Sequence, residues 1–202
     1  MSSAFEKYEE DKHYTYADLL EWDDDVRAEI INGVLYMMSP PLTIHQRVQA
    51  RLFKHFVIFL EGKTCEAFVA PFGVRLFPKE DLSDDTVVEP DIVVVCDPDK
   101  IDERGCNGPP DLIIEIVSPS NSRRDRLLKF NLYLKAKVRE YWIVHPNYKE
   151  IDVNILDEDR YTTQTYGVNE PDAKENEKLE EIVPVTVVPG LEIDVKDIFK
   201  ET

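Results

Sequence analysis

The sequence predicts an α/β or α+β fold in which helices pack on a mixed β-sheet. A hairpin signal lies near the N-terminus at Asn32-Gly33, and a long amphipathic helix pattern covers residues 43–60. Between residues 111 and 144, an apolar run, a helical segment and a second apolar run follow one another. A strand–helix–strand unit forms a right-handed crossover with parallel strands. Parallel strands combined with additional β-hairpins give a mixed sheet.

The first predicted elements are a short helix, a hairpin and a long helix. Thr15-Tyr16-Ala17-Asp18 resembles a capping box and predicts a helix reaching Trp22. Strands at 29–31 and 34–37 flank the Asn-Gly turn. Thr43 is predicted to cap the long helix, which ends before Gly62. Apolar residues on this helix recur every four positions and form one face: Ile44, Val48, Leu52, Phe56 and Leu60.

The middle of the chain predicts extended segments joined by loops. Residues 65–77 look extended, with interruptions at Pro71 and Gly73. Residues 87–96 predict a strand that contains Pro90. Because proline has no N–H for the ladder, we expect a bulge or a shift of pairing there. A loop is predicted at 97–110, followed by the central strand at 111–117, a turn at 118–122, a helix from Ser122 to about Lys137 and a strand at 140–144. The rest of the chain predicts a hairpin of 150–156 with 160–166, an acidic loop at 172–181, and a final strand and helical turn within 183–199.

Composition limits the class of protein. The chain has 202 residues, of which 43% are hydrophobic, so we expect one folded domain over residues 1–202. The net charge of −17 disfavours nonspecific attraction to phosphate backbones, although a local site for nucleic acid is not excluded. No apolar stretch approaches the ~20 residues that span a bilayer. No secretory signal is visible. The 3 cysteines lack metal-site spacing, so reduced thiols, a cytoplasmic location and no membrane association are expected.

A carboxylate inside an apolar strand is the main functional signal. Glu115 interrupts the apolar run 112–117. Burying an unpaired carboxylate costs several kcal/mol, so such a residue is normally paired, protonated or bound to a metal. Asp91 opens another apolar run, and two acids on neighbouring strands would suit Mg²⁺ or Mn²⁺, with the Ile116 carbonyl as a third oxygen ligand. Without metal, we expect desolvation to raise the pKa of Glu115.

Other polar residues are candidates for the same site. Lys129, on the helix after the central strand, could stabilise developing negative charge or orient an attacking water. Glu29 in the first hairpin could be a further ligand or base, and His45 in the first turn of the long helix could meet a phosphate or a water. Several basic residues could form a phosphate track: Arg123, Arg124, Arg126, Lys135, Lys137 and Arg139.

Each candidate also has a purely structural interpretation. Asp91 follows Pro90 and could belong to a turn. Glu115 could face solvent if one side of the sheet is open. Lys129 and Asp125, four residues apart, could be a surface ion pair. The remaining structural alternatives are a solvated helix start for the arginines, an ordinary polar helix position for His45 and cross-strand pairing for Glu29.

Several segments together resemble the Uma2 family, also called DUF820, of restriction-endonuclease-like proteins abundant in cyanobacteria. The matching segments are 89–95, 108–120, 125–129 and 138–144, with further likeness at 29–33, 39–41, 45–46, 190–191 and 198–199. The family is placed in the PD-(D/E)xK nuclease superfamily. The resemblance therefore implies a restriction-endonuclease-like mixed sheet flanked by helices, and a nuclease site that uses a divalent metal.

The resemblance also implies roles for individual residues. Asp91 and Glu115 would be metal ligands, and Glu29 would be the early acid. In the superfamily a lysine follows the second acid by two residues, but Val117 occupies that position here. Lys129 would be the substitute catalytic lysine. The implied activity is Mg²⁺-dependent endonucleolytic cleavage of DNA, and a homodimer is possible because such enzymes often dimerise to meet two strands.

Two rival hypotheses come from other classes. A catalytically silent binding or regulatory protein with a nuclease fold is favoured by the charge of −17 and by Val117. A structural subunit whose acidic surface meets a basic partner protein is the third hypothesis.

Overall fold

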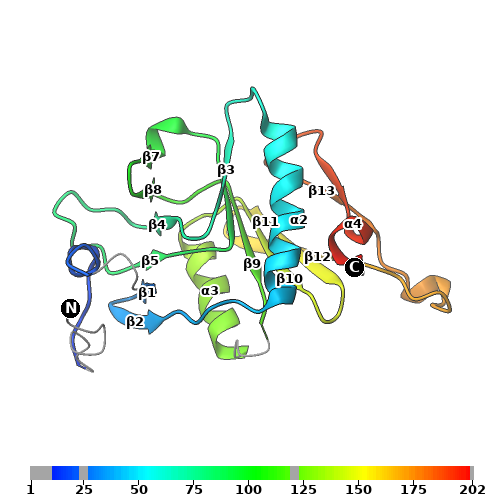
Figure 1. The fold of residues 1–202 in the computed structure, drawn as a ribbon, viewed down its shortest axis with the longest axis horizontal. Coiled ribbons are helices and arrows are strands. Elements are labelled where there is room, and N and C mark those ends of the chain that lie inside the picture. Colours follow the sequence, from blue (N-terminus) through cyan, green and yellow to red (C-terminus); the bar gives the residue numbers. More distant parts are fainter. Residues whose placement is uncertain (1–10, 23–26, 119–122, 201–202) are drawn as a thin grey trace.

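The computed structural model describes residues 11–22, 27–118 and 123–200, with only the backbone described at 123–125. It contains two six-stranded sheets and one two-stranded sheet. Helices lie on the sheets, as Figure 1 shows. The predicted mixed sheet flanked by helices is therefore confirmed, but the strands divide between two large sheets instead of forming one.

The larger sheet has the strand order β12-β11-β10-β9-β6-β3. Its strands are β3 Glu66–Val69, β6 Ile92–Val95, β9 Leu112–Ile116, β10 Glu140–His145, β11 Glu150–Asp157 and β12 Arg160–Gly167. Strands β9 and β10 are parallel, and α3, Arg123–Lys135, connects them. The other neighbours in this sheet are antiparallel. The predicted crossover is thus confirmed, with a helix that ends two residues before the predicted Lys137.

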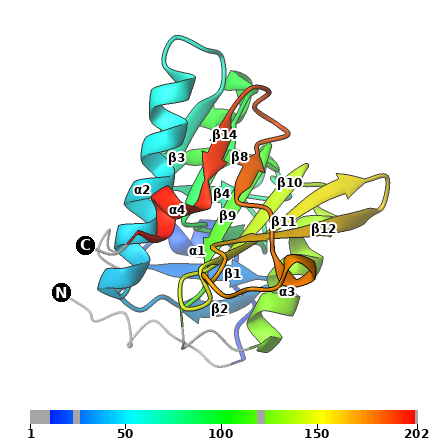
Figure 2. The same ribbon diagram turned by 90° about the vertical axis from the view of Figure 1, so that its right-hand side faces the viewer.

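Two helices cover opposite faces of the larger sheet, as Figures 1 and 2 show. Helix α2, Thr43–Leu60, packs against Ile114 and its neighbours in one core. Helix α3 packs against Ile113 in the other core. Because successive side chains of a strand alternate between faces, Glu115 lies on the α3 face, the face that carries Ile113.

The smaller sheet begins with the predicted hairpin. Its strands are β1 Ala28–Ile31, β2 Val34–Met37, β4 Gly73–Arg75, β5 Val87–Val88, β7 Ile101–Asp102 and β8 Gly105–Asn107. Asn32 and Gly33 have φ values of 51° and 78°, which is the left-handed geometry that a two-residue hairpin turn requires. A Cβ atom on Gly33 would lie 2.0 Å from the His13 ring, so no larger residue fits. Strands β7 and β8 and a 3₁₀ turn, η2 Pro98–Lys100, correct the prediction of a plain loop at 97–110.

The predicted strand over 87–96 changes partners at Pro90, as expected. Strand β5 pairs in the smaller sheet, and β6 pairs in the larger one. The segment from Glu89 to Asp91 crosses between the two sheets. Asp91 is consequently placed at the junction of the sheets, directly before the first residue of β6.

Several local predictions differ from the structure. Helix α2 begins at Thr43 itself, with Leu42 as its N-cap residue, so Thr43 is not the cap. Helix α1, Tyr16–Leu19, has the predicted capping box, in which the Thr15 backbone N–H donates to Asp18 Oδ2 at 2.7 Å, but it is shorter than predicted. Cys65 and Cys96 form a disulfide, which corrects the expectation of three reduced thiols. The predicted Ser122 cap lies outside the described residues.

The C-terminal part follows the prediction with one addition. A 3₁₀ turn, η3 Glu175–Glu177, lies within the expected acidic loop. Strands β13 Ile182–Pro184 and β14 Glu192–Asp194 pair with each other, and α4, Val195–Phe199, contributes to the core beneath α2. In the part of the chain that the structure describes, no helix has the length and apolar character needed to cross a membrane.

Candidate active site

Asp91 and Glu115 lie next to each other across the pairing of β6 with β9. Ile92 is the register partner of Ile114 in this antiparallel pair, so one further step places Asp91 opposite Glu115. The Ile116 backbone N–H donates to Asp91 Oδ2 at 2.6 Å, and His45 Nε2 lies 3.1 Å from the same oxygen. Asp91 is therefore held both by the neighbouring strand and by the first turn of α2.

Lys129 reaches the acids from α3. Its Nζ lies 2.9 Å from Glu115 Oε1 and 2.8 Å from Glu29 Oε1. The Tyr133 hydroxyl donates to Glu115 Oε1 at 2.6 Å. Glu29 is anchored in turn, since the Glu89 backbone N–H donates to its Oε1 at 2.9 Å. Residues from β1, β9 and α3 thus form one connected network around a lysine that is only 19% exposed.

The network holds more negative than positive charge. Lys129 is the cation, while Glu29, Glu115 and the adjacent Asp91 are carboxylates. Burial raises the pKa of Glu115 to about 7, with Lys129 opposing this rise and the two other acids adding to it. Burial alone would lower the pKa of Lys129, but the carboxylates of Glu115 and Glu29 raise it well above its ordinary value. The direction at Glu115 is the one expected from the sequence.

The donor set fits a hard divalent cation. Among the described residues, Asp91 Oδ1, Glu115 Oε2 and Glu29 Oε2 have no hydrogen-bond partner. The described part of the chain contains no group of three or more His, Cys, Asp and Glu side chains arranged to hold a metal. Mg²⁺ is usually bound by one or two carboxylates and keeps several waters, so a full protein cage is not required. Oxygen donors and surplus negative charge suit Mg²⁺ or Mn²⁺ better than Zn²⁺.

The residues expected to contact nucleic acid are placed differently from one another. His45 is only 8% exposed, and its Nδ1 is buried without a partner in the described structure. The geometry gives His45 a contact with Asp91, and its contact with nucleic acid stays a prediction. Arg126 is partly buried on α3. Arg123 and Arg124 begin α3, but their side chains lie outside the described residues.

The rest of the expected phosphate track is largely occupied by acids. Lys137 binds Asp159, and Arg139 Nη1 lies 2.8 Å from Asp111 Oδ1. These cations are therefore paired within the chain, so they offer less positive charge to a nucleic acid than the sequence alone implied. The Lys129 amine contacts Glu29 and Glu115, and the Asp125 side chain of the alternative surface ion pair lies outside the described residues.

Two contacts of the site were not identified from the sequence. Tyr133 is fully buried and donates to Glu115. Gln49 Nε2 donates to the Asp91 carbonyl at 2.9 Å. Each follows a predicted site residue by four positions, since Tyr133 follows Lys129 and Gln49 follows His45. Residues four apart share a helix face, so this spacing was the available signal.

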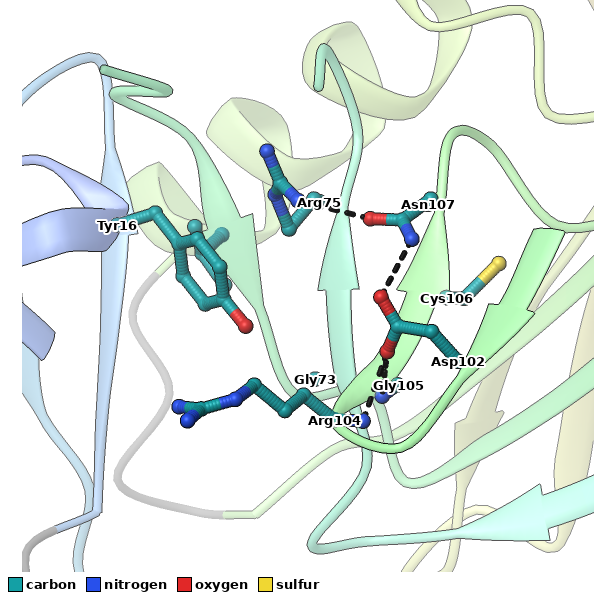
Figure 3. Close-up of a pocket in the computed structure, with 9 residues that line it drawn as sticks. Tyr16, Gly73, Arg75, Asp102, Arg104, Gly105, Cys106 and Asn107 are labelled. Carbon is teal, nitrogen blue, oxygen red and sulfur yellow. Dashed lines mark hydrogen bonds between the residues drawn. The ribbon is translucent and has the colours of Figure 1, made fainter. Parts of the chain in front are cut away.

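A second largely buried cation, Arg75, lies in the smaller sheet, as Figure 3 shows. The Arg75 guanidinium donates through Nε to Asp84 Oδ2 at 2.6 Å and through Nη1 to Asn107 Oδ1 at 2.9 Å. Asn107 Nδ2 then donates to Asp102 Oδ2 at 2.5 Å. The guanidinium carbon lies 4.5 Å from the centre of the Tyr16 ring. The cavity between these groups measures about 10 Å³, room for no more than one water.

The mixed sheets flanked by helices define a restriction-endonuclease-like fold. The family model of Uma2, described as "Putative restriction endonuclease", matches residues 16–196. The chain therefore belongs to the Uma2 family.

A solved structure and a curated protein are similar to this chain. The crystal structure of a putative nuclease belonging to DUF820 from Anabaena variabilis shares 22% identity and a TM-score of 0.69, covering 92% of this chain and 97% of its own. This likeness shows the fold. The uncharacterized protein slr1290 of Synechocystis sp. is 27% identical over 139 residues, which is 67% of this chain and 70% of that protein.

Proposed function

We propose that this protein is a Mg²⁺-dependent endonuclease that hydrolyses phosphodiester bonds of DNA, with residues 1–202 acting as one nuclease domain. The observation that carries the proposal is the placement of the Lys129 amine 2.9 Å from Glu115, on the strand that also binds Asp91. Membership of a family described as restriction endonucleases supports the same class of reaction.

Asp91 and Glu115 would hold the cation, with the Ile116 carbonyl as a third oxygen ligand. When bound there, a divalent cation supplies charge neutralisation at the phosphate and lowers the pKa of a water that it binds. Asp91 Oδ1 and Glu115 Oε2 are the oxygens that remain for this role after the protein's own hydrogen bonds are made.

Lys129 would donate hydrogen bonds to the attacking water or to the negative charge that develops on the phosphate. Glu29 keeps the ammonium in place and helps to keep it protonated. The amine takes the role of the lysine that is missing at Val117, because α3 delivers it to the same acid from the helix side. His45 and the Ile116 N–H would act as positioning groups that fix Asp91.

DNA would approach the end of the larger sheet where α2 and α3 begin. Arg123, Arg124 and Arg126 would contact phosphates from the first turn of α3, whose positive dipole end also favours anions. These contacts are local, which is how a chain with a net charge of −17 could still bind DNA. A homodimer would allow two such sites to meet two strands.

Cleavage assays on the purified protein test the proposal. Supercoiled plasmid, duplex and single-stranded DNA oligonucleotides, and RNA, are incubated with Mg²⁺, Mn²⁺ or EDTA. We expect metal-dependent nicking by the wild type and a loss of about 10²–10³-fold in the cleavage rate of Lys129→Met, since removing one charge-stabilising donor costs about that factor. Lys178→Met, which removes an exposed lysine paired with Glu175, is the matched control and should cleave like the wild type.

The rival hypothesis of a catalytically silent protein makes the opposite prediction. If the wild type shows no Mn²⁺ affinity by calorimetry and cleaves no form of DNA, the nuclease proposal is wrong. Binding of DNA without cleavage under all metal conditions would then favour a binding or regulatory role.

A further inference from the structure

A second polar cavity lies beside the Lys129 network. It has a volume of about 520 Å³, and its walls include Val117, Arg126, His145, Tyr148 and Asp152. Cavities that hold small ligands usually measure 300–1,000 Å³. The volume is therefore sufficient for one nucleobase with its sugar.

The cavity and the proposed active site share the end of β9 and the first turns of α3. Val117 follows Glu115 by two residues, directly after the last residue of β9, which is about 6.6 Å along an extended chain. Arg126 precedes Lys129 by three residues, so both side chains lie on one side of α3. A strand cut at the acids would thus place a neighbouring nucleotide at this cavity.

A hydrogen-bonded polar pair lines the cavity. His145, at the end of β10, and Asp152, on β11, lie on neighbouring antiparallel strands. His145 Nε2 lies 2.9 Å from Asp152 Oδ2, and the Thr165 hydroxyl donates to Asp152 Oδ1 at 2.6 Å. Both oxygens of Asp152 are therefore used within the protein. The carboxylate holds the imidazole by one nitrogen and leaves Nδ1 for a ligand.

An exposed aromatic ring stands at the rim. Tyr148 is 74% exposed, the largest exposed fraction among the large apolar side chains of the described residues. Its ring lies 6.3 Å from the His145 ring in an edge-to-face arrangement. Every nucleobase has a flat face, and base–aromatic stacking binds single strands without sequence preference.

The charges of the cavity favour a base over a bare phosphate. Arg126 contributes one positive charge, whereas Glu150 and Asp152 contribute two carboxylates. A phosphate in the centre would face net repulsion. A neutral base could donate amino hydrogens to Glu150 and bond to the Asn147 amide, while its own phosphate met Arg126 at the edge. A base inside a duplex is paired and stacked, so only an unpaired base can enter.

We propose that this cavity binds an unpaired nucleobase of the nucleic-acid strand that is cut, with Tyr148 as its stacking platform. The substrate would then be single-stranded nucleic acid or a duplex with an unpaired segment. The link to cleavage rests on the proposed function, but binding of the unpaired base can be measured without cleavage.

Fluorescence anisotropy tests the proposal with Ca²⁺ in place of Mg²⁺ at one fixed salt concentration. The probes are a labelled 12-nucleotide DNA single strand and a blunt duplex of the same sequence. We expect Tyr148→Ala to weaken binding of the single strand about tenfold and to leave the duplex unchanged, because one stacked base contributes about that factor. Tyr148→Phe should keep the wild-type affinity. Ile58→Ala, which truncates another exposed side chain (62% exposed) on α2, is the matched control.

A spectroscopic measurement separates stacking from a general loss of affinity. 2-Aminopurine in the single strand should lose fluorescence on binding to the wild type and Tyr148→Phe, but not to Tyr148→Ala at saturating protein. The proposal is overturned if the wild type fails to bind the single strand, or if Tyr148→Ala binds and quenches it like the wild type.

The outcomes distinguish this inference from the nuclease proposal. Tyr148-dependent binding without any cleavage by the wild type would retain the base cavity and reject the nuclease. Metal-dependent cleavage with unchanged binding in Tyr148→Ala would retain the nuclease and reject the base cavity.

Discussion

Arg75 and Lys129 are both largely buried cations that bind carboxylates, but the two clusters differ in how completely their groups are paired. Arg75 donates to Asp84, Asn107 and the Lys79 carbonyl. Asp84 has a side chain that is 0% exposed, and both its oxygens accept hydrogen bonds. Lys129 instead faces two glutamates with a third acid, Asp91, beside them. In the described structure, each of these three acids keeps one oxygen without a hydrogen bond.

This difference in pairing distinguishes the Arg75 cluster, a structural ion pair, from the Lys129 network, a candidate functional site. A closed pair balances its charges and leaves room for about one water, as at Arg75. The Lys129 network keeps surplus negative charge in a buried place, and that arrangement destabilises the folded protein unless a cation or proton joins it. Proteins break the rule of full pairing mainly at functional sites. We therefore expect that removing a charge lowers the stability of the protein at the Arg75 cluster and raises it at the Lys129 network.

Breaking the Arg75 cluster should have the largest effect on stability. Arg75→Met leaves Asp84 as a buried carboxylate without its cation, which costs about 3–5 kcal/mol of unfolding free energy. Urea unfolding followed by circular dichroism measures the loss. Arg104→Met, at an exposed arginine that lines the same small cavity, is the control and should change stability by less than about 0.5 kcal/mol. Equal stability of Arg75→Met and wild type would show that the two clusters do not differ in this way.

Removing a negative charge from the Lys129 network should instead increase the stability of the protein. At pH 8 we expect Glu115→Gln to be more stable than the metal-free wild type by roughly 1–3 kcal/mol, because glutamine resembles the protonated acid that burial favours. The pKa of Glu115 is about 7 in the folded protein and 4.5 as the ordinary value. Between pH 4.5 and 7, Glu115 is therefore protonated in the folded state but ionised in the unfolded state. Because the folded state binds more protons in this range, the free energy of unfolding of the wild type falls as pH rises through it.

Urea titrations at pH 4.5 and pH 8 measure this effect. The advantage of Glu115→Gln should be present at pH 8 and absent at pH 4.5, where the wild-type acid is protonated in the folded state. If Glu115→Gln is less stable than the wild type at pH 8, the charges of the Lys129 network are balanced within the protein, as they are in the Arg75 cluster.

The pH dependence of metal binding tests whether the surplus negative charge of the Lys129 network binds a cation. A cation competes with the proton on Glu115, whose pKa of about 7 is set first by burial and then by Lys129, Glu29, Asp91 and the Tyr133 hydroxyl. We expect the affinity for Mn²⁺ to rise by up to about tenfold per pH unit below pH 7 and to level off above it. Calorimetry at pH 6, 7 and 8 measures this rise. Glu115→Gln should bind weakly with no such step, whereas pH-independent binding by the wild type would place the cation elsewhere.

The sequence predicted much of the geometry of the candidate site because its signals were local. Glu115 interrupts an apolar strand, and Asp91 follows a proline that forces a change of pairing. Their meeting then requires only that β6 and β9 become neighbours. The crossover through α3 could also be predicted from the sequence, since strand–helix–strand units have one common handedness. This crossover brings Lys129 back over β9.

Other features depended on contacts that no local pattern reveals. Glu140 also lies in an apolar strand, but it accepts hydrogen bonds from Trp142 Nε1 and the Val187 N–H, each at 2.8 Å, and serves the core. Sequence alone does not separate this glutamate from Glu115. The division into two sheets depends on pairs distant in the chain, such as β4 with β8. The Cys65–Cys96 disulfide follows from pairing of β3 with β6, which spacing alone did not indicate.

Removal of the Tyr133 hydroxyl should have the smallest effect. Tyr133→Phe deletes the 2.6 Å hydrogen bond to Glu115 Oε1 while keeping the buried ring, so we expect a loss of only about 1 kcal/mol or less in stability. The hydroxyl favours the ionised carboxylate, so its removal should raise the pKa of Glu115 further and shift the pH dependence of Mn²⁺ binding to higher pH. Tyr161→Phe is the control, because its hydroxyl donates to the Val138 carbonyl instead. An unshifted pH profile in Tyr133→Phe would show that the phenol supports packing alone, and that the charge on Glu115 is governed by burial and the charged groups around it.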